Sequence, residues 1–195
     1  MSMAKAEGLA TFGMELNPEG VRLARAAGHE VYDCLASELL RDPNSRRFSL
    51  VTAWQVLEHV PDPVEFLRDC ALLARPGGFV GVAVPNEDGG HRLCPYDPHL
   101  WPPHHISRWR GRDLAAAGAK AGLRLVKSGS DVLSGSMAKH FWLLHNKLAP
   151  GLGFKPHPGG ELLPSILWLL YRKSGARHFL PRRGPSVYAF FTRPA

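Results

Sequence analysis

The sequence predicts an α/β protein in which a mostly parallel sheet is covered by helices on both faces. Short runs of β-type residues alternate along the chain with segments of helical periodicity, which is typical of this layered architecture. The run Phe48–Val56 is almost continuously apolar, as expected of a strand buried on both faces, and Phe79–Val84 has the strongest strand character of all. Proline and glycine separate the runs and mark where each element begins and ends.

The first predicted unit is a strand, a helix and a second strand. The strand covers Leu9–Leu16 and is followed by a helix over Pro18–Ala27. Asn17 is the predicted N-cap of this helix, Pro18 fits its first position, and Gly28 comes directly after its end. The next strand is predicted at His29–Leu35, and a loop connects it to the following strand. Residues Met1–Leu9 resemble the end of an earlier helix that Gly8 terminates.

The central part of the chain continues the alternation. After the apolar strand Phe48–Val56, Asp62 and Pro63 begin a helix with apolar residues at helical spacing. Residues 75–78 (Arg-Pro-Gly-Gly) end that helix and lead into the strand Phe79–Val84. An irregular stretch rich in proline and histidine, Gly89–Pro103, follows. The later elements are a helix stopped by Gly122, a strand, two helical candidates and a closing strand: Gly111–Ala121, Leu123–Lys127, Met137–Leu148, Leu162–Tyr171 and Ser186–Thr192.

The net charge of +7 is concentrated at one end of the chain. From Ser134 onward there are nine basic residues and one acidic residue, Glu161. With 195 residues, one domain is expected, divided into a core (1–133), a basic helical insertion or lid (134–185) and a last strand (186–195). The basic segment suggests peripheral contact with an anionic membrane, or simply a solvated surface. We expect no nucleic-acid partner.

Cysteine usage and apolar run lengths indicate a cytoplasmic protein. Cys34, Cys70 and Cys94 are far apart in the sequence, which favours neither a disulfide framework nor a structural zinc site. No charged start followed by an apolar run is present, so we expect no signal peptide. The longest apolar stretch, Leu162–Tyr171, is about half of the ~20 residues that a transmembrane helix needs.

Five short segments, in this order, resemble the class I S-adenosylmethionine-dependent methyltransferases, in particular the branch that contains ubiquinone-biosynthesis O-methyltransferases. These segments are 57–63 (LEHVPDP), 75–78 (RPGG), 84–86 (VPN), 103–109 (PHHISRW) and 121–123 (AGL). Residues 13–17 (GMELN) also look like the end of the second strand of that fold, and Ser186–Thr192 resembles its antiparallel last strand. The resemblance implies a Rossmann-like sheet, S-adenosylmethionine as cofactor, and methyl transfer to a small-molecule or lipid-like acceptor, by O- or C-methylation.

The resemblance also implies where the cofactor binds. In an open α/β sheet, ligands lie at the carboxyl ends of the strands. Glu15 stands at such an end, where a carboxylate can accept hydrogen bonds from both ribose hydroxyls; alternatively it is a charge at the start of the following helix. The expected cofactor contacts are Glu15, Leu16, Ser37 near the adenine, and Gln55, Val56 and Leu57 beneath the methylthio group.

Glu58 and His59 permit several interpretations. Some related enzymes hold a divalent metal with a Glu-x-x-Glu-His arrangement and a later histidine, but Gln55 occupies the first position here and is a poorer ligand for a hard cation. We therefore predict no metal, and name His59 and His104 as candidate catalytic residues, with His59 as general base; alternatively, His59 packs beneath the cofactor loop and only orders it. His104 and His105 point in different directions in an extended backbone, so one of them at most faces the pocket. Trp101 and Trp109 are candidate walls for an acceptor, or core anchors of the loop.

The glycine-rich turn that grips the cofactor in this family is not found before Glu15. The strand that normally precedes that turn lies between the strands around Met14 and Thr52. Truncation, a degenerate non-catalytic relative and direct pairing of the two flanking strands are the alternatives, and we favour truncation. A methyltransferase-like binding module without catalysis is the alternative function.

We expect the 195 residues alone to bind S-adenosylmethionine weakly or not at all, because backbone amides of the missing turn would supply much of the contact. Isothermal titration of the purified chain measures this affinity. Binding at micromolar concentration would contradict the expectation.

Overall fold

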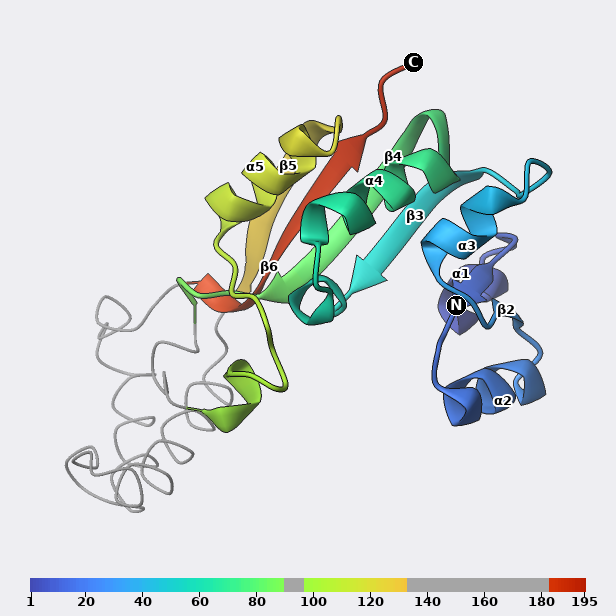
Figure 1. Ribbon diagram of the computed structural model, residues 1–195, viewed down its shortest axis with the longest axis horizontal. Helices are drawn as coiled ribbons and strands as arrows, with labels where there is room; N and C mark the ends of the chain where they lie inside the picture. Colours follow the sequence, from blue (N-terminus) through green and yellow to red (C-terminus); the bar gives the residue numbers. More distant parts are fainter. Residues whose placement is uncertain (90–96, 133–182) are drawn as a thin grey trace. The chain divides into compact units, whose positions relative to one another are not determined.

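A computed structural model describes residues 1–89, 97–132 and 183–195 of the chain (Figure 1). They form two compact units, Met1–Phe48 and Ser49–Ala195. The predicted helices Met137–Leu148 and Leu162–Tyr171, and nearly all of the proposed insertion or lid at 134–185, lie outside the described residues. Among the residues that are described, no helix has the length and apolar character needed to cross a lipid bilayer.

The first unit has two short parallel strands and three short helices. Its elements are α1 (Ser2–Ala6), β1 (Phe12–Met14), α2 (Pro18–Ala26), β2 (Glu30–Tyr32) and α3 (Ala36–Arg41). Strands β1 and β2 pair in parallel, with Phe12 opposite Glu30. The Phe12 ring lies 5.5 Å from the ring of Phe48 and 6.5 Å from that of Tyr32, measured between centroids. The predicted strand–helix–strand order is confirmed, with shorter strands than expected.

The ends of α1 and α2 follow the sequence signals. The Asn17 side chain accepts hydrogen bonds from the amides of Glu19 (2.9 Å) and Gly20 (3.3 Å) and so caps the start of α2. Gly8 and Gly28, which follow α1 and α2, adopt φ angles of +79° and +77°. Such left-handed conformations strain residues with a Cβ atom, so glycine is the residue expected there. The predicted cap and both predicted stops are confirmed.

The loop predicted after β2 is wrong, because α3 occupies part of it. The N-cap position of α3 is Leu35, whose side chain can cap nothing, so the usual start signal is absent. The Glu38 carboxylate instead reaches back and accepts a hydrogen bond from the Leu35 amide at 2.8 Å. An acidic side chain at the third helical position is the weaker half of a capping box, and it is easily missed in a sequence.

The second unit is built on a four-stranded sheet. Its elements are β3 (Phe48–Trp54, starting at the unit boundary), η1 (Leu57–His59), α4 (Pro63–Leu73), β4 (Ala74–Pro85), η3 (Pro98–Leu100), α5 (Gly111–Lys120), β5 (Arg124–Val132) and β6 (Arg183–Thr192). The strand order is β3-β4-β6-β5. Strand β6 is antiparallel to both of its neighbours, which confirms the antiparallel last strand.

The core of this unit lies between the sheet and two helices. Helices α4 and α5 pack side by side on one face of the sheet (Figure 1). Asp62 caps α4 by accepting a hydrogen bond from the Glu65 amide at 2.9 Å, and Gly122 follows α5 with φ +79°. The fully buried apolar side chains of this core come from both helices and from the central strands: Leu67, Leu114, Val80, Val82, Val84, Ala189 and Phe191.

Strand β3 corrects one expectation. It was predicted to be buried on both faces, yet of its residues only Ala53 is buried, while Leu50 is 52% exposed. The reason is its position at the edge of the four-stranded sheet, whereas α4 and α5 pack on β4, β5 and β6. Strand β1 belongs to the two-stranded sheet with β2. Direct pairing of the strands around Met14 and Thr52, which belong to different units, stays untested.

We expect Arg193→Ala to lower the free energy of unfolding by about 1–3 kcal/mol. The Arg193 guanidinium donates to three carbonyl oxygens at the end of α4: those of Ala71 (3.3 Å), Leu72 (3.2 Å) and Ala74 (2.7 Å). It thus satisfies acceptors that a helix end leaves unpaired and places a cation at the negative end of the helix dipole. Urea denaturation measures the change. Arg183→Ala, which removes an exposed side chain at the start of β6, is the control and should change stability little.

Candidate active site

The site begins where the chain leaves β3. Gln55 adopts φ +55°, and among the described residues it alone has a positive φ without being glycine. Its amide donates to the Ala83 carbonyl of β4 at 2.8 Å, which holds this left-handed turn against the sheet. Directly after it, η1 buries the Leu57 and Glu58 side chains completely and leaves that of His59 about half exposed. The turn therefore presents Glu58 and His59 at the carboxyl end of β3.

A second segment, distant in sequence, is fixed against η1 by hydrogen bonds. The amides of Ile106 and Ser107 both donate to the Glu58 carbonyl, at 3.0 and 3.3 Å. The Ser107 hydroxyl lies 3.4 Å from the Leu57 carbonyl and accepts from the Trp109 indole at 2.9 Å. The segment between η3 and α5 is therefore positioned by backbone groups, with the buried Trp109 as its anchor.

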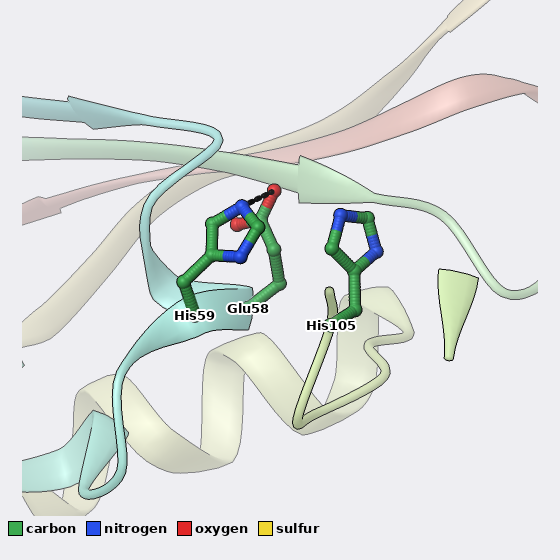
Figure 2. Close-up of side chains that lie close together, drawn as sticks. All are labelled: Glu58, His59 and His105. Atoms are coloured by element: carbon green, nitrogen blue, oxygen red, sulfur yellow. Dashed lines mark ion pairs between the residues drawn. The ribbon is translucent and has the colours of Figure 1, made fainter. Parts of the chain in front are cut away.

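These contacts bring together Glu58, His59 and His105 (Figure 2). The His59 Nε2 atom lies 3.9 Å from the Glu58 Oε1 atom, and the two imidazole rings are 4.9 Å apart between centroids, edge to face. One potential ligand atom from each of the three residues lies within 4.8 Å of the others. The cluster thus joins one carboxylate and two imidazoles at the carboxyl ends of the strands, where open α/β sheets bind ligands.

The Glu58 carboxyl group is buried without a hydrogen-bond partner. The residue is 1% exposed, and within the described part of the chain neither carboxyl oxygen is hydrogen-bonded. Burial raises the pKa of the Glu58 carboxyl, because removal from water penalises its charged form; the residue's own backbone amide and, to a smaller extent, the nearby His59 oppose this. An unpaired buried acid costs stability and is retained where a ligand or a reaction uses it.

We expect Glu58→Gln to raise the free energy of unfolding of the metal-free protein at neutral pH by about 1–3 kcal/mol. The pKa of Glu58 is raised in the folded state, so the contribution of this carboxyl to stability is present at low pH and is lost as the pH rises through the folded value. The advantage of the glutamine variant should therefore grow with pH. Thermal denaturation with a chelator present measures it, and an equal or lower stability of the variant across the range would contradict it.

The tautomer of the neutral His59 ring is set by its neighbour. Its Nδ1 atom lies 2.7 Å from the carbonyl oxygen of His104, which can only accept a hydrogen bond. Nδ1 therefore carries a proton, and in the neutral ring Nε2 presents a lone pair next to Glu58. A second-sphere carbonyl that orients a histidine in this way is typical of bases and of metal ligands.

A shallow, open depression adjoins the cluster at His105. Its wall includes Glu87 and Arg108, which form a two-point ion pair, and the buried Trp109. The Arg108 guanidinium also stacks on the Trp101 ring at 4.4 Å from the centroid. An aromatic and polar wall next to two imidazoles suits a flat acceptor with oxygen substituents. Sequence reasoning missed Glu87 and Arg108, although Arg108 stands within the segment 103–109.

The structure places the predicted cofactor residues of the first unit at the ends of its strands. Glu15 follows β1 directly, and its Oε1 atom accepts hydrogen bonds from the amides of Leu16 and Asn17, both at 2.8 Å. This geometry fits the alternative prediction, in which Glu15 is an acidic group placed before a helix. The same two hydrogen bonds also hold the Glu15 carboxylate at the end of β1. Ser37 lies in the first turn of α3 and is exposed, as is Leu16.

The predicted residues of the second unit lie around the η1 turn. Gln55 and Val56 are exposed between β3 and η1, whereas Leu57 is completely buried in the hydrophobic core and supports the turn from within. Of the two adjacent histidines, His105 and not the predicted His104 joins the cluster. His104 contributes its backbone carbonyl, and its ring lies near that of His99 at 5.6 Å.

The donor set of the cluster fits a divalent cation. Two imidazoles and one carboxylate are common ligands of transition ions, and both oxygens of the buried Glu58 lack a partner among the described residues. The predicted absence of a metal stays untested. These residues nevertheless support the alternative of metal binding, in which His105 is the distant ligand. The carboxylate found at the first position of the arrangement in related enzymes is replaced here by the amide of Gln55.

Comparison with known protein families and sequences gives a consistent result. The family model described as a methyltransferase domain matches residues 1–128. A ubiquinone biosynthesis O-methyltransferase of Bordetella bronchiseptica is 32% identical over 139 residues, which cover 63% of this chain and 56% of that protein. One from Idiomarina loihiensis is 34% identical over 94 residues, covering 45% and 39%. The chain thus spans about half of the length of these curated relatives, or less.

Solved structures show the same fold at low sequence identity. A SAM-dependent methyltransferase of Archaeoglobus fulgidus aligns with a TM-score of 0.63 and 16% identity over 98% of this chain and 79% of that chain. A methyltransferase from Bacillus halodurans, described as putative, aligns with a TM-score of 0.58 and 17% identity over 94% and 83%. Since the family model matches well over half of the chain and the sheet has the antiparallel last strand of that fold, the chain belongs to the class I S-adenosylmethionine-dependent methyltransferases.

Proposed function

We propose that the protein transfers a methyl group from S-adenosylmethionine to a hydroxyl oxygen of a small-molecule or lipid-like acceptor. The single observation that carries this proposal is the cluster of Glu58, His59 and His105 at the carboxyl end of β3, beside an open pocket. Methylation of oxygen requires loss of the hydroxyl proton, and the cluster offers groups that can take or stabilise it. The two O-methyltransferase relatives support oxygen as the acceptor atom.

The chain's own residues have distinct parts in this proposal. The cofactor supplies an electrophilic methyl group on a sulfonium. The His59 Nε2 atom accepts the hydroxyl proton of the acceptor, while the carbonyl of His104 holds the ring in the required tautomer. His105 and the pocket wall with Trp109 and Arg108 orient the acceptor oxygen. In-line displacement depends mainly on such alignment.

Cofactor binding by this chain is proposed from the predicted residues and from the family. The contacts proposed are Glu15, Leu16, Ser37, Gln55 and Val56, whereas Leu57, which was also predicted, is completely buried. Because Leu57 is buried, the part proposed for it is to support the turn from within the core. The Glu15 carboxylate is held in place by two backbone amides, and it is proposed to accept hydrogen bonds from the ribose hydroxyls. A cytoplasmic location and membrane contact through the basic tail from Ser134 onward stay predictions, as does the single-domain organisation.

The test is an assay of the full-length protein with cofactor that carries a labelled methyl group and a panel of catechols and other phenols, with and without a prenyl chain. We expect label in an O-methyl product, identified by mass spectrometry. Label on carbon would replace O-methylation by C-methylation. Cofactor binding without transfer to any acceptor in the panel or in a lipid extract would favour the non-catalytic alternative.

A further inference from the structure

Glu87 and Arg108 are brought together by a short backbone pairing beside the depression. Asn86, which follows β4, and Trp109 form an isolated parallel bridge. The Glu87 amide donates to the Trp109 carbonyl at 2.9 Å, so that Arg108 comes to lie opposite Glu87. The two side chains meet in a two-point ion pair, in which the Arg108 Nε and Nη2 groups face the two oxygens of the Glu87 carboxylate. Both residues line the depression, as does His105.

The ion pair is held in place on two sides. The Arg108 guanidinium stacks on the Trp101 ring, 4.4 Å from the ring centroid, and binds Glu87 through one edge. The side chains of Arg108 and Glu87 are 31% and 22% exposed, so the pair is partly withdrawn from water and still reachable from the depression. Charges that are partly buried are screened less by water and salt than exposed ones. The charges of this wall therefore act on a molecule that binds beside it.

Glu87 decides the net charge of this wall, because the next carboxylate along the chain already faces other cations. Asp88 lies 3.4 Å from the Arg110 guanidinium and 3.5 Å from that of Arg183. With Glu87 ionised, the charge of Arg108 is neutralised, while its Nη1 group keeps N–H donors for an uncharged oxygen. A carboxylate on a bound molecule would instead meet the negative charge of Glu87 next to Arg108 and gain little net attraction.

We infer that Glu87 makes this site select acceptors that are uncharged where they face Arg108, and that it discriminates against acceptors that carry a carboxylate there. The inference rests on the proposed function, because it concerns the acceptor of the same site. Without the charge of Glu87, the Arg108 guanidinium is a planar, permanently charged donor whose geometry matches a carboxylate. The Trp101 ring still supports it in that case, so Glu87→Gln should turn the wall into a site for an anionic acceptor.

The test compares two acceptors of the same shape and different charge in the full-length protein: protocatechuate, a catechol that carries a carboxylate, and its neutral amide. We expect the wild type to use the amide with a kcat/KM about tenfold or more above that of protocatechuate. Glu87→Gln should shift the ratio of the two kcat/KM values toward protocatechuate by about 10- to 100-fold, the usual range for a hydrogen bond to a charged group. Dissociation constants from ligand-observed NMR titration measure the same ratio without catalysis.

Two further variants test the physical cause. In the double variant Glu87→Gln with Arg108→Gln the shift should vanish, because the charge that attracts the carboxylate is gone. Glu19→Gln is the matched control, since it removes the same two-point pairing with an arginine, Arg22, from an exposed helix of the first unit. It should leave the ratio unchanged, and circular dichroism should show that all variants are folded.

The inference is overturned if the wild type does not distinguish the two compounds, or if neither compound binds. It is also overturned by a Glu87→Gln ratio within about threefold of the wild-type value, or by a shift that persists without Arg108. Methylation of both compounds without the shift retains the proposed function and removes only the role of Glu87. A shift in the binding ratio without methylation of either compound supports the role of Glu87 and counts against the proposed function.

Discussion

Replacing His59 by alanine is expected to lower kcat for methyl transfer by about 10²- to 10⁴-fold, which is the usual contribution of a general base. The His59 side chain is about half exposed, so its removal leaves no cavity in the core. Its Nδ1 proton is bound to the His104 carbonyl, which leaves Nε2 as the atom that can accept the acceptor's proton. The assay is transfer of a labelled methyl group by the full-length variant at saturating cofactor and acceptor.

The rate loss should appear in kcat more than in KM, because the proton is taken in the transition state. His59→Gln places an amide in the same position without a basic nitrogen and should be equally slow. His99→Ala, in which the ring bonded to Asp97 is lost, is the matched control and should retain full activity. A His59→Ala enzyme within about threefold of the wild-type kcat would exclude His59 as the base.

Local signals in the sequence were sufficient for the starts of α2 and α4 and for the ends of α2 and α5, although not for α3. The Asn17 and Asp62 caps act on the first amides of α2 and α4, as expected from residues that are adjacent in the chain. Gly28 and Gly122 adopt the left-handed conformation that ends a helix. Each of these features depends on contacts within about four residues, so no knowledge of the tertiary structure is needed to predict it.

Features that depend on distant residues were not predictable in the same way. The choice of His105 over His104 follows from two hydrogen bonds, from the amides of Ile106 and Ser107 to the carbonyl of Glu58, which set the rotation of that segment. Nothing in the adjacent histidines themselves distinguishes one from the other. The exposure of β3 has the same origin, because an apolar pattern reports what a strand can bury and not which neighbours cover it.

The burial of Glu58 shows how the fold and the site are linked. The Glu-His pair is apparent in the sequence, but its chemistry depends on the loss of water from one member and not from the other. Leu57 anchors the turn in the core, and the segment around Ser107 covers it. Together they exclude solvent from the carboxyl group and leave the imidazole accessible. The difference in solvent exposure between Glu58 and His59 is therefore a result of packing.

Phe191→Ala is expected to lower the free energy of unfolding by about 3–5 kcal/mol, the usual cost of removing a buried aromatic ring. Phe191 is completely buried at the centre of the core, where β6 pairs it with Val80 of β4 and Leu125 of β5. Urea denaturation measures the loss. Val126→Ala, at a residue that is 55% exposed, is the control and should change stability by less than about 1 kcal/mol.

Gly118 of α5 tests the same contact from the opposite side, because a Cβ atom at this position would overlap the Phe191 ring. Alanine is the better helix former by about 1 kcal/mol, so helix propensity alone predicts that Gly118→Ala stabilises the protein. Close packing predicts the reverse, because overpacking of the core should lower the free energy of unfolding by about 1–3 kcal/mol. The smaller, more flexible side chain of Phe191→Leu should relieve that clash, so the double variant should be more stable than the sum of the two single changes allows. A stabilising Gly118→Ala, or strictly additive effects, would show that α5 does not pack on β6 as closely as described.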